Sequence, residues 1–171
     1  MRKKKFNTVQ SVLKISILLF LLSIAFSCEK EEVGPGHIYY SSFEKKSDLT
    51  GWEGMYELQR NSPPSGGLQS IYISGGCLIP HAYLELGPFD ENLNLSIECW
   101  GKNLDNGGSV TLATEDYNSA IFLSIEDESW KYYKTDSTLF CPAGKKLQIS
   151  LSSGGLISSS MLIDMVKIVG K

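Results

Sequence analysis

The residues best suited to ligand chemistry in this chain lie on segments that alternate between apolar and polar side chains. In residues 93–101 one face of the expected strand is apolar, and the other carries Glu98 and Trp100 among Asn and Ser. An indole ring can stack on the apolar C–H side of a sugar ring, and a carboxylate can bind its hydroxyl groups. We therefore predict Trp100 and Glu98 as ligand-binding residues.

The same alternation sorts other aromatic residues by face. Tyr72 falls with Ser70 and Ser74, and residues 81–87 place His81 and Tyr83 with Glu85, opposite Ala82 and Leu84. Tyr72, Tyr83 and His81 join the predicted ligand set on this basis. Phe122 falls beside Ser124 and Glu126 and is not included. The competing interpretation is that large aromatic residues are packed beneath loops, which is what we expect for Trp52 and Trp130.

The residues give little support for catalysis. The sequence has no GxSxG or HExxH motif and only two histidines, so general bases and nucleophiles are scarce. Glu85 and Glu98 could share a surface as the paired carboxylates of a glycosidase, but any solvated sheet can present such a pair. We predict that the protein is not an enzyme.

The elements that must position these residues are strands. Period-two alternation, broken by Gly, Ser, Pro and Asn, predicts strands at 37–44, 52–59, 69–74, 81–87, 93–101, 109–115, 119–126, 130–136, 146–152 and 160–169. "NGG" and "SGG" are interpreted as hairpin turns. Short strands at this spacing predict an all-β fold, an antiparallel β-sandwich of the jelly-roll kind.

The N-terminal segment has the composition of a secretory signal. Four basic residues, Arg2 to Lys5, precede a 12-residue apolar stretch at 15–26, which is too short to span a bilayer, since a span needs about 20 residues. Without residues 1–27 the chain has 11 basic and 19 acidic residues. A body this acidic argues against nucleic-acid binding, which uses clustered Lys and Arg.

The stretch "AFSC" (25–28) resembles the lipobox of bacterial lipoproteins, in which the cysteine becomes the lipidated first residue. Lys30, Glu31 and Glu32 resemble the surface-export signal of Bacteroidetes-type lipoproteins. Several acyl chains on one cysteine would give a durable anchor. The resemblance implies lipidation of Cys28 and a location at the outer membrane, facing the cell exterior. It divides the chain into a signal peptide (1–27), a lipidated cysteine with an acidic tether (28–36) and a β-sandwich domain (37–171).

Three stretches of the body resemble galactose-binding-like jelly rolls, the fold of many carbohydrate-binding modules. They are "YYSSFEKKSDLTGWE", with its Phe43-Glu44 pair, "GGLQSIYISGG", and "MLIDMVKI" near the C-terminus. In such modules the opening Glu and the closing Asp commonly help to bind a structural Ca²⁺. The resemblance therefore implies a glycan ligand, and a calcium site that includes Glu44 and Asp164.

Asp164 is unusual on its pattern alone. It is in step with Leu162, Val166 and Ile168, an otherwise apolar face. A buried carboxylate needs a cation or hydrogen-bond donors, and Ca²⁺ is a hard ion that takes oxygen ligands. The alternative is that Asp164 accepts hydrogen bonds from the backbone near a sheet end.

Cys77, Cys99 and Cys141 form no CxxC pair and include no zinc-like spacing. Their pairing is not predicted, and a buried free thiol is expected for Cys99.

The leading functional hypothesis is a surface lipoprotein whose sandwich domain binds a glycan without catalysis. The alternatives are a module that binds a protein partner in a surface complex, and a small glycan-active enzyme.

Overall fold

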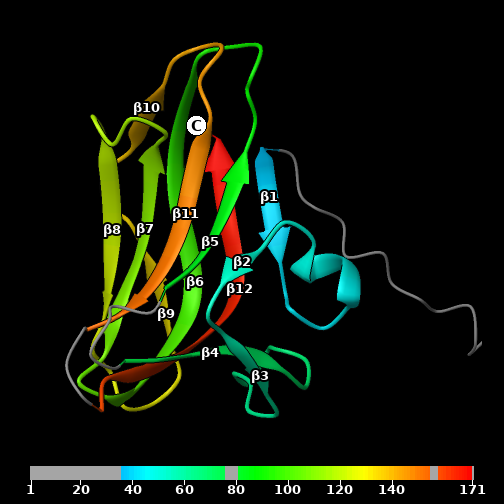
Figure 1. The fold of residues 1–171 in the computed structure, drawn as a ribbon, viewed down its shortest axis with the longest axis vertical. Coiled ribbons are helices and arrows are strands. Elements are labelled where there is room, and N and C mark those ends of the chain that lie inside the picture. Colours follow the sequence, from blue (N-terminus) through cyan, green and yellow to red (C-terminus); the bar gives the residue numbers. More distant parts are fainter. Residues whose placement is uncertain (1–35, 76–80, 155–157, 171) are drawn as a thin grey trace, which may run out of the picture. The chain divides into compact units, whose positions relative to one another are not determined.

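The computed structural model describes residues 36–75, 81–154 and 158–170 of this chain. The predictions for the signal peptide, Cys28 and the acidic tether lie outside these residues, apart from Gly36, and so does Cys77. No helix in the described ranges is long and apolar enough to cross a membrane. The described residues form two antiparallel sheets that pack face to face (Figure 1).

The larger sheet, called sheet A, has seven strands. They are β1 (His37–Ser41), β3 (Glu57–Gln59), β4 (Ser70–Ser74), β6 (Leu93–Asp105), β9 (Lys131–Lys134), β10 (Leu139–Cys141) and β12 (Ser160–Gly170). The long strands β6 and β12 pair at its centre. β9 and β10 pair along the other edge of β6, β1 and β4 along the other edge of β12, and β3 beside β4.

The smaller sheet, called sheet B, has five strands in the order β2-β5-β11-β7-β8. They are β2 (Glu53–Gly54), β5 (His81–Leu86), β7 (Gly108–Thr114), β8 (Ala120–Ile125) and β11 (Leu147–Ser153). Figure 1 shows β8, β7, β11 and β5 side by side. A short 3₁₀ helix, η1 (Lys46–Leu49), precedes β2.

The alternation in the sequence explains the core. Every second residue of β8 and β11 is buried, because successive side chains of a strand point to opposite faces. The inward residues of sheet B, such as Ile149, join Ile97 and Ile163 of sheet A in one apolar cluster. Each fully buried aliphatic side chain of this kind stabilises the fold by roughly 1.5–3 kcal/mol. The predicted all-β antiparallel sandwich is confirmed.

Several element boundaries differ from the predictions. Residues 52–59 form two strands in different sheets, β2 and β3, and the short strand β10 was not predicted. β6 continues to Asp105, and a turn at Asn106 and Gly107, both with positive φ, leads into β7. A Cβ on Gly107 would lie 2.2 Å from a backbone oxygen of β8, so the turn needs glycine there. "NGG" therefore forms a turn as predicted, but it is not a hairpin turn, because β6 belongs to sheet A and β7 to sheet B and the two strands do not pair.

A bulge in β12 overturns the predicted face of Asp164. Asp164 pairs with Trp100, and Lys167, three residues later, pairs with Glu98 on the same face of β6. The extra residue is accommodated at Met165, which has a φ of 50°. Asp164 therefore lies on the outer face of sheet A, whereas Val166 and Ile168 belong to the core. Period-two counting could not detect the change of face.

Candidate functional site

The structure divides the predicted ligand residues between the two sheets. Trp100 and Glu98 lie on β6, and Tyr72 lies on β4, all on the outer face of sheet A. Tyr83 and His81 lie on β5 of sheet B. The two outer faces point away from each other across the core, so Trp100, Glu98 and Tyr72 do not converge with Tyr83 on one small ligand; the side chain of His81 lies outside what the structure describes.

On sheet A, Glu98 is held by its neighbours across the strands. Its side chain is only 10% exposed, and one oxygen lies 2.6 Å from Lys134 Nζ. The Tyr132 hydroxyl donates a hydrogen bond to the other oxygen. Burial by itself would raise the pKa of Glu98, but Lys134 and Tyr132 outweigh it and lower that pKa. The carboxylate is thus already occupied by protein donors.

The aromatic residues beside Glu98 are also packed against protein groups. Trp100 is half-buried, and its ring centre lies 5.9 Å from that of Tyr132. In the neighbouring row, Lys167 Nζ lies 5.1 Å from the centre of the Tyr40 ring, a cation–π contact. These side chains cover the middle of sheet A, and their rings already contact other side chains of the protein.

The segment 61–69, called the glycine loop, lies against both predicted metal ligands. A Cβ on Gly66 would meet Asp164 Oδ2 at 2.5 Å, and one on Gly67 would meet Glu44 Oε1 at 2.5 Å. Glu44 Oε1 accepts hydrogen bonds of 2.7 Å from the backbone N–H groups of Leu68 and Gln69. The loop thereby covers this part of sheet A, where Asp164 is fully buried.

The two carboxylates are an incomplete metal site by themselves. No group of three or more His, Cys, Asp or Glu suited to a metal occurs among the described residues. Asp164 Oδ1 accepts a 2.7 Å hydrogen bond from the N–H of Met165. A Ca²⁺ ion here would need further oxygen ligands from backbone carbonyls or water, which is chemistry that calcium sites commonly use.

The outer face of sheet B has a different composition. Strand pairing aligns one row across all five strands: Glu53, Tyr83, Ser150, Thr111 and Phe122. The residues in the middle of this row are small and polar, and Phe122 at its end is 67% exposed. Two aromatic side chains thus stand on either side of a low, hydroxyl-bearing floor.

Hydrogen bonds orient the rim of this floor. The Tyr83 hydroxyl donates a 2.6 Å hydrogen bond to Glu53 Oε2, and this bond, together with the nearby charge of Glu53, raises the pKa of Tyr83. Tyr117, which is 60% exposed, donates to Gln148 Oε1. The rings of Tyr83 and Tyr117 are therefore held in defined positions while remaining in contact with solvent.

One end of the sheet B face is hollowed. A cavity of about 290 Å³ is lined mainly by small and polar residues, with one apolar residue, Ile125; the others are Asn106, Gly108, Ser109, Ser124, Glu126, Ser152, Ser153 and Gly154. Hydroxyl, amide and carboxylate groups of this kind can donate to and accept from a polyhydroxylated ligand. The hollow is continuous with the floor through Ser109 and Ser152, which lie on β7 and β11.

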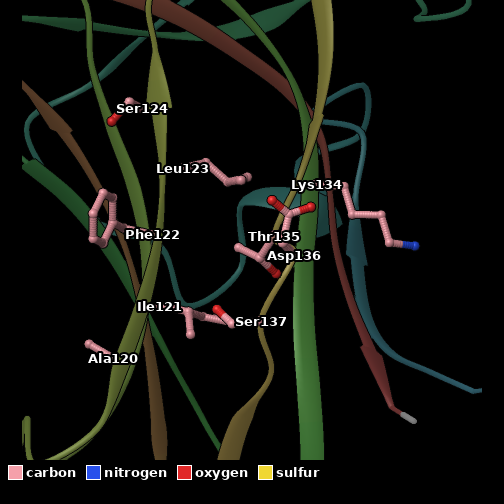
Figure 2. Close-up of a pocket in the computed structure, with 9 residues that line it drawn as sticks. All are labelled: Ala120, Ile121, Phe122, Leu123, Ser124, Lys134, Thr135, Asp136 and Ser137. Atoms are coloured by element: carbon pink, nitrogen blue, oxygen red, sulfur yellow. The ribbon is translucent and has the colours of Figure 1, made fainter.

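A second depression, called the β8 groove, runs beside the edge strand of sheet B. It has a volume of about 370 Å³ and lies between residues 120–124 and residues 134–137 (Figure 2). Ile121 and Leu123 point toward the 134–137 segment, and Phe122 points to the other side of the strand. Phe122 and Ser124 line both the groove and the sheet B face or its hollow.

Known structures with a similar architecture include carbohydrate-binding modules. The domain resembles the CBM22-1 xylan-binding domain from Paenibacillus barcinonensis (TM-score 0.55, 14% identity, 79% of this chain and 95% of that one). It also resembles a family 16 carbohydrate-binding module (TM-score 0.56, 14% identity, 71% and 92%). The domain has the same β-sandwich architecture as these modules.

Sequence comparison adds no closer relative. No family model matches the chain, and no curated protein is significantly similar to it. Some structural matches are parts of enzymes. One is the enzymatically active domain of tailspike protein 4 from bacteriophage CBA120, of which this chain covers 20% (TM-score 0.56, 11% identity, 76% of this chain). At these identities the comparisons establish the fold.

The sequence did not single out Phe122, Thr111 or Ser150. Alternation placed Phe122 on a polar face beside Ser124, which was the available signal. It could not show that Phe122 and Tyr83, 39 positions apart in the sequence, stand in one row with small residues between them. That information depends on the strand order of sheet B.

Proposed function

We propose that the outer face of sheet B binds a glycan chain without catalysis. The observation that supports this is the row in which Tyr83 and Phe122 flank the small residues Ser150 and Thr111. Likeness to carbohydrate-binding modules supports the same ligand class, although a fold by itself does not determine function.

The dimensions and chemistry of the row suit an extended ligand. Three strand spacings separate Tyr83 from Phe122, which is about 14 Å at roughly 4.8 Å per strand. Sugar rings could stack on the two aromatic side chains. Between them, the hydroxyls of Ser150 and Thr111 would exchange hydrogen bonds with the ligand's own hydroxyls. The small floor lets the chain lie close to the sheet.

Affinity electrophoresis against a panel of soluble polysaccharides would test this. Xylan belongs first on the panel because one structural neighbour is a xylan-binding domain, followed by galactan and mixed-linkage glucan. We expect Phe122→Ala to weaken binding about 30-fold, as for an aromatic residue that contributes about 2 kcal/mol to binding. Phe140→Ala removes a 51% exposed aromatic residue from sheet A and is the matched control. Equal loss with both variants, or no retention of wild type, would contradict the proposal.

We further propose that Glu44 and Asp164 hold a structural Ca²⁺, with the glycine loop and backbone carbonyls completing the ligands. The two carboxylates lie against adjacent residues of one loop. An ion that binds only the folded state raises its stability, so we expect a higher melting temperature in millimolar Ca²⁺ than in EDTA. The Glu44→Gln variant should respond less to Ca²⁺. Identical melting curves for wild type in both conditions would rule the ion out.

We also propose that Cys28 carries lipid and holds the domain at the outer surface of an outer membrane. The support is the sequence pattern around Cys28, with a basic and apolar segment before it and an acidic segment after it. Cys28→Ala should move the protein from the membrane fraction to the soluble fraction. Recovery of that variant in the membrane fraction would refute the anchor. Protease accessibility on intact cells would test which side the domain faces.

A further inference from the structure

The β8 groove has features of a binding site that the sheet B face alone does not supply. Among the described residues β8 pairs with β7 alone, so its other edge presents backbone N–H and C=O groups to the groove. Ile121 and Leu123, each 7% exposed, form an apolar floor. The groove volume of about 370 Å³ is within the range of small-molecule sites, roughly 300–1,000 Å³.

The opposite wall of the groove is held in place by Thr135. Its backbone N–H donates a 3.1 Å hydrogen bond to the carbonyl of Ile97, and its Oγ1 accepts one of 3.2 Å from the Ile97 N–H. Thr135 is buried, whereas the next two residues, Asp136 and Ser137, are exposed. A carboxylate and a hydroxyl are therefore presented to the groove from a fixed backbone, a preorganised arrangement that favours binding.

Lys134, at the other end of this wall, already forms an ion pair with Glu98. Lys134 Nζ lies 2.6 Å from Glu98 and, in Figure 2, points away from Asp136. The polar groups left at the groove are a carboxylate, a hydroxyl and strand-edge amides. These groups recognise neighbouring hydroxyls of a neutral sugar, and Asp136 would repel a sulfated or uronic unit.

The groove is continuous with the face that binds glycan under the proposed function. Residues 120–124 form one wall of the groove, and Phe122 of the same strand ends the row on the sheet B face. A chain that lies across the row and passes Phe122 reaches the edge of β8 next. No described strand closes the sheet beyond β8.

We propose that the β8 groove is an end subsite for one further unit of the same neutral glycan chain, bound through Asp136 and Ser137. This inference rests on the proposed function of sheet B. It deepens that function in one respect: the domain binds along an extended chain that crosses the strands and continues over the β8 edge.

Titration calorimetry with oligosaccharides of increasing length tests the subsite. Xylotriose and xylohexaose are the probes, or the matching fragments of galactan or mixed-linkage glucan if one of those is the polysaccharide retained. The double variant Asp136→Ala/Ser137→Ala should weaken hexasaccharide binding roughly three- to tenfold, the value of one lost hydrogen bond or slightly more, and leave trisaccharide binding unchanged. Ser137→Phe, which fills the groove, should have the same effect. Asp90→Ala, an exposed carboxylate in the β5–β6 connection, is the matched control.

The outcomes separate the two proposals. If Phe122→Ala weakens both oligosaccharides and the groove variants bind both as wild type does, the subsite is wrong and the sheet B site stands. If the groove variants weaken both lengths equally, the groove belongs to the main site and is not an end subsite. If wild type binds no saccharide, both the subsite and the proposed binding of a glycan chain are excluded. The same conclusion follows if the groove binds a peptide strand beside β8 instead.

Discussion

The two outer faces of this sandwich carry similar residue types and differ in what those residues do. On sheet A, Trp100 packs on Tyr132, and Glu98 is bound by Tyr132 and Lys134. On sheet B, Tyr83 and Phe122 stand apart across a floor of small residues. The comparison shows that an aromatic residue and a carboxylate on a polar face can be bound by other side chains of the same sheet.

The difference originates in the residues on neighbouring strands. Lys134 and Lys167 lie opposite Glu98 on either side of β6. Lys134 forms an ion pair with Glu98, and the nearby charge of Lys167 helps to lower the pKa of Glu98. Serine and threonine opposite Tyr83 on β11 and β7 are too short to do so. Aromatic residues on a sheet face therefore remain available to a ligand when the strands between them carry short side chains.

The largest effect on stability is expected for Trp100→Ala. Removing this half-buried ring leaves Tyr132 unsupported and should lower the free energy of unfolding by about 2 kcal/mol, somewhat less than for a fully buried tryptophan. Glycan binding to sheet B should be unchanged. Denaturant unfolding and affinity electrophoresis measure the two quantities. Loss of binding with stability retained would return the ligand site to sheet A, as the sequence predicted.

The next effect concerns the loop that covers sheet A. In Gly67→Ala the new Cβ would lie 2.3 Å from Glu44 Cδ, so Glu44 must move and weaken its bonds to the Leu68 and Gln69 N–H groups. We expect the free energy of unfolding to fall by about 1–2 kcal/mol. Gly170→Ala is the control, because its Cβ would meet no atom closer than 3.5 Å. Equal stability of the two variants would show that the loop is not held by Glu44.

A smaller, pH-dependent effect is expected for Glu98→Gln. Because the folded-state pKa of Glu98 is lowered, its ionised form stabilises the fold above the ordinary Glu pKa of about 4.3, and this contribution is lost as the pH falls through the lowered value. Lys134 is half exposed and screened by solvent, so the loss at neutral pH should be about 1 kcal/mol.

Melting curves from pH 7 to pH 3 test this expectation. The stabilities of wild type and Glu98→Gln should differ at neutral pH and converge at the acid end. Glu85→Gln, which alters an exposed carboxylate 3.2 Å from Lys146 on sheet B, serves as the control and should show a much smaller difference. A constant gap between wild type and Glu98→Gln at every pH would mean that the charge of Glu98 is not what stabilises sheet A.

The smallest effect is expected for Tyr83→Phe. The variant keeps the ring but loses the hydroxyl that donates to Glu53. Because this pair is exposed, the melting temperature should barely change, while affinity for the retained polysaccharide should fall about threefold through loss of one hydrogen bond or of ring orientation. An unchanged affinity would show that the Tyr83 hydroxyl takes no part in binding. The contact between Tyr83 and the glycan would then involve the ring alone.

Much of the fold was predictable because its signal is local. In β8 and β11 each residue's burial follows from its own type and its position in the alternation, and the turn at Asn106–Gly107 follows from its dipeptide. The split of 52–59 into β2 and β3 was not predictable, since the two short strands join different sheets. The bulge at Met165 was missed because one inserted residue changes the face without changing the composition.

The candidate site was predictable only in part. Tyr83, predicted from its polar neighbours, lies on the sheet B face that we propose as the glycan site, whereas Trp100 and Glu98, selected on the same criterion, lie on the opposite sheet with partners of their own. Cys99 is a buried free thiol, as the sequence predicted, and desolvation raises its pKa. Cys141 is also a buried free thiol, and burial raises its pKa as well.

The sequence by itself determined that this domain is an antiparallel β-sandwich and which residues of regularly alternating strands such as β8 and β11 face inward, because alternation and turn chemistry act over a few residues. Only the tertiary structure decided which outward residues remain available to a ligand. That depends on strand order and register, which set whether the neighbours are long and charged, as around Glu98, or short and hydroxylated, as around Tyr83. Contacts between strands distant in sequence have no local signal from which they could be deduced.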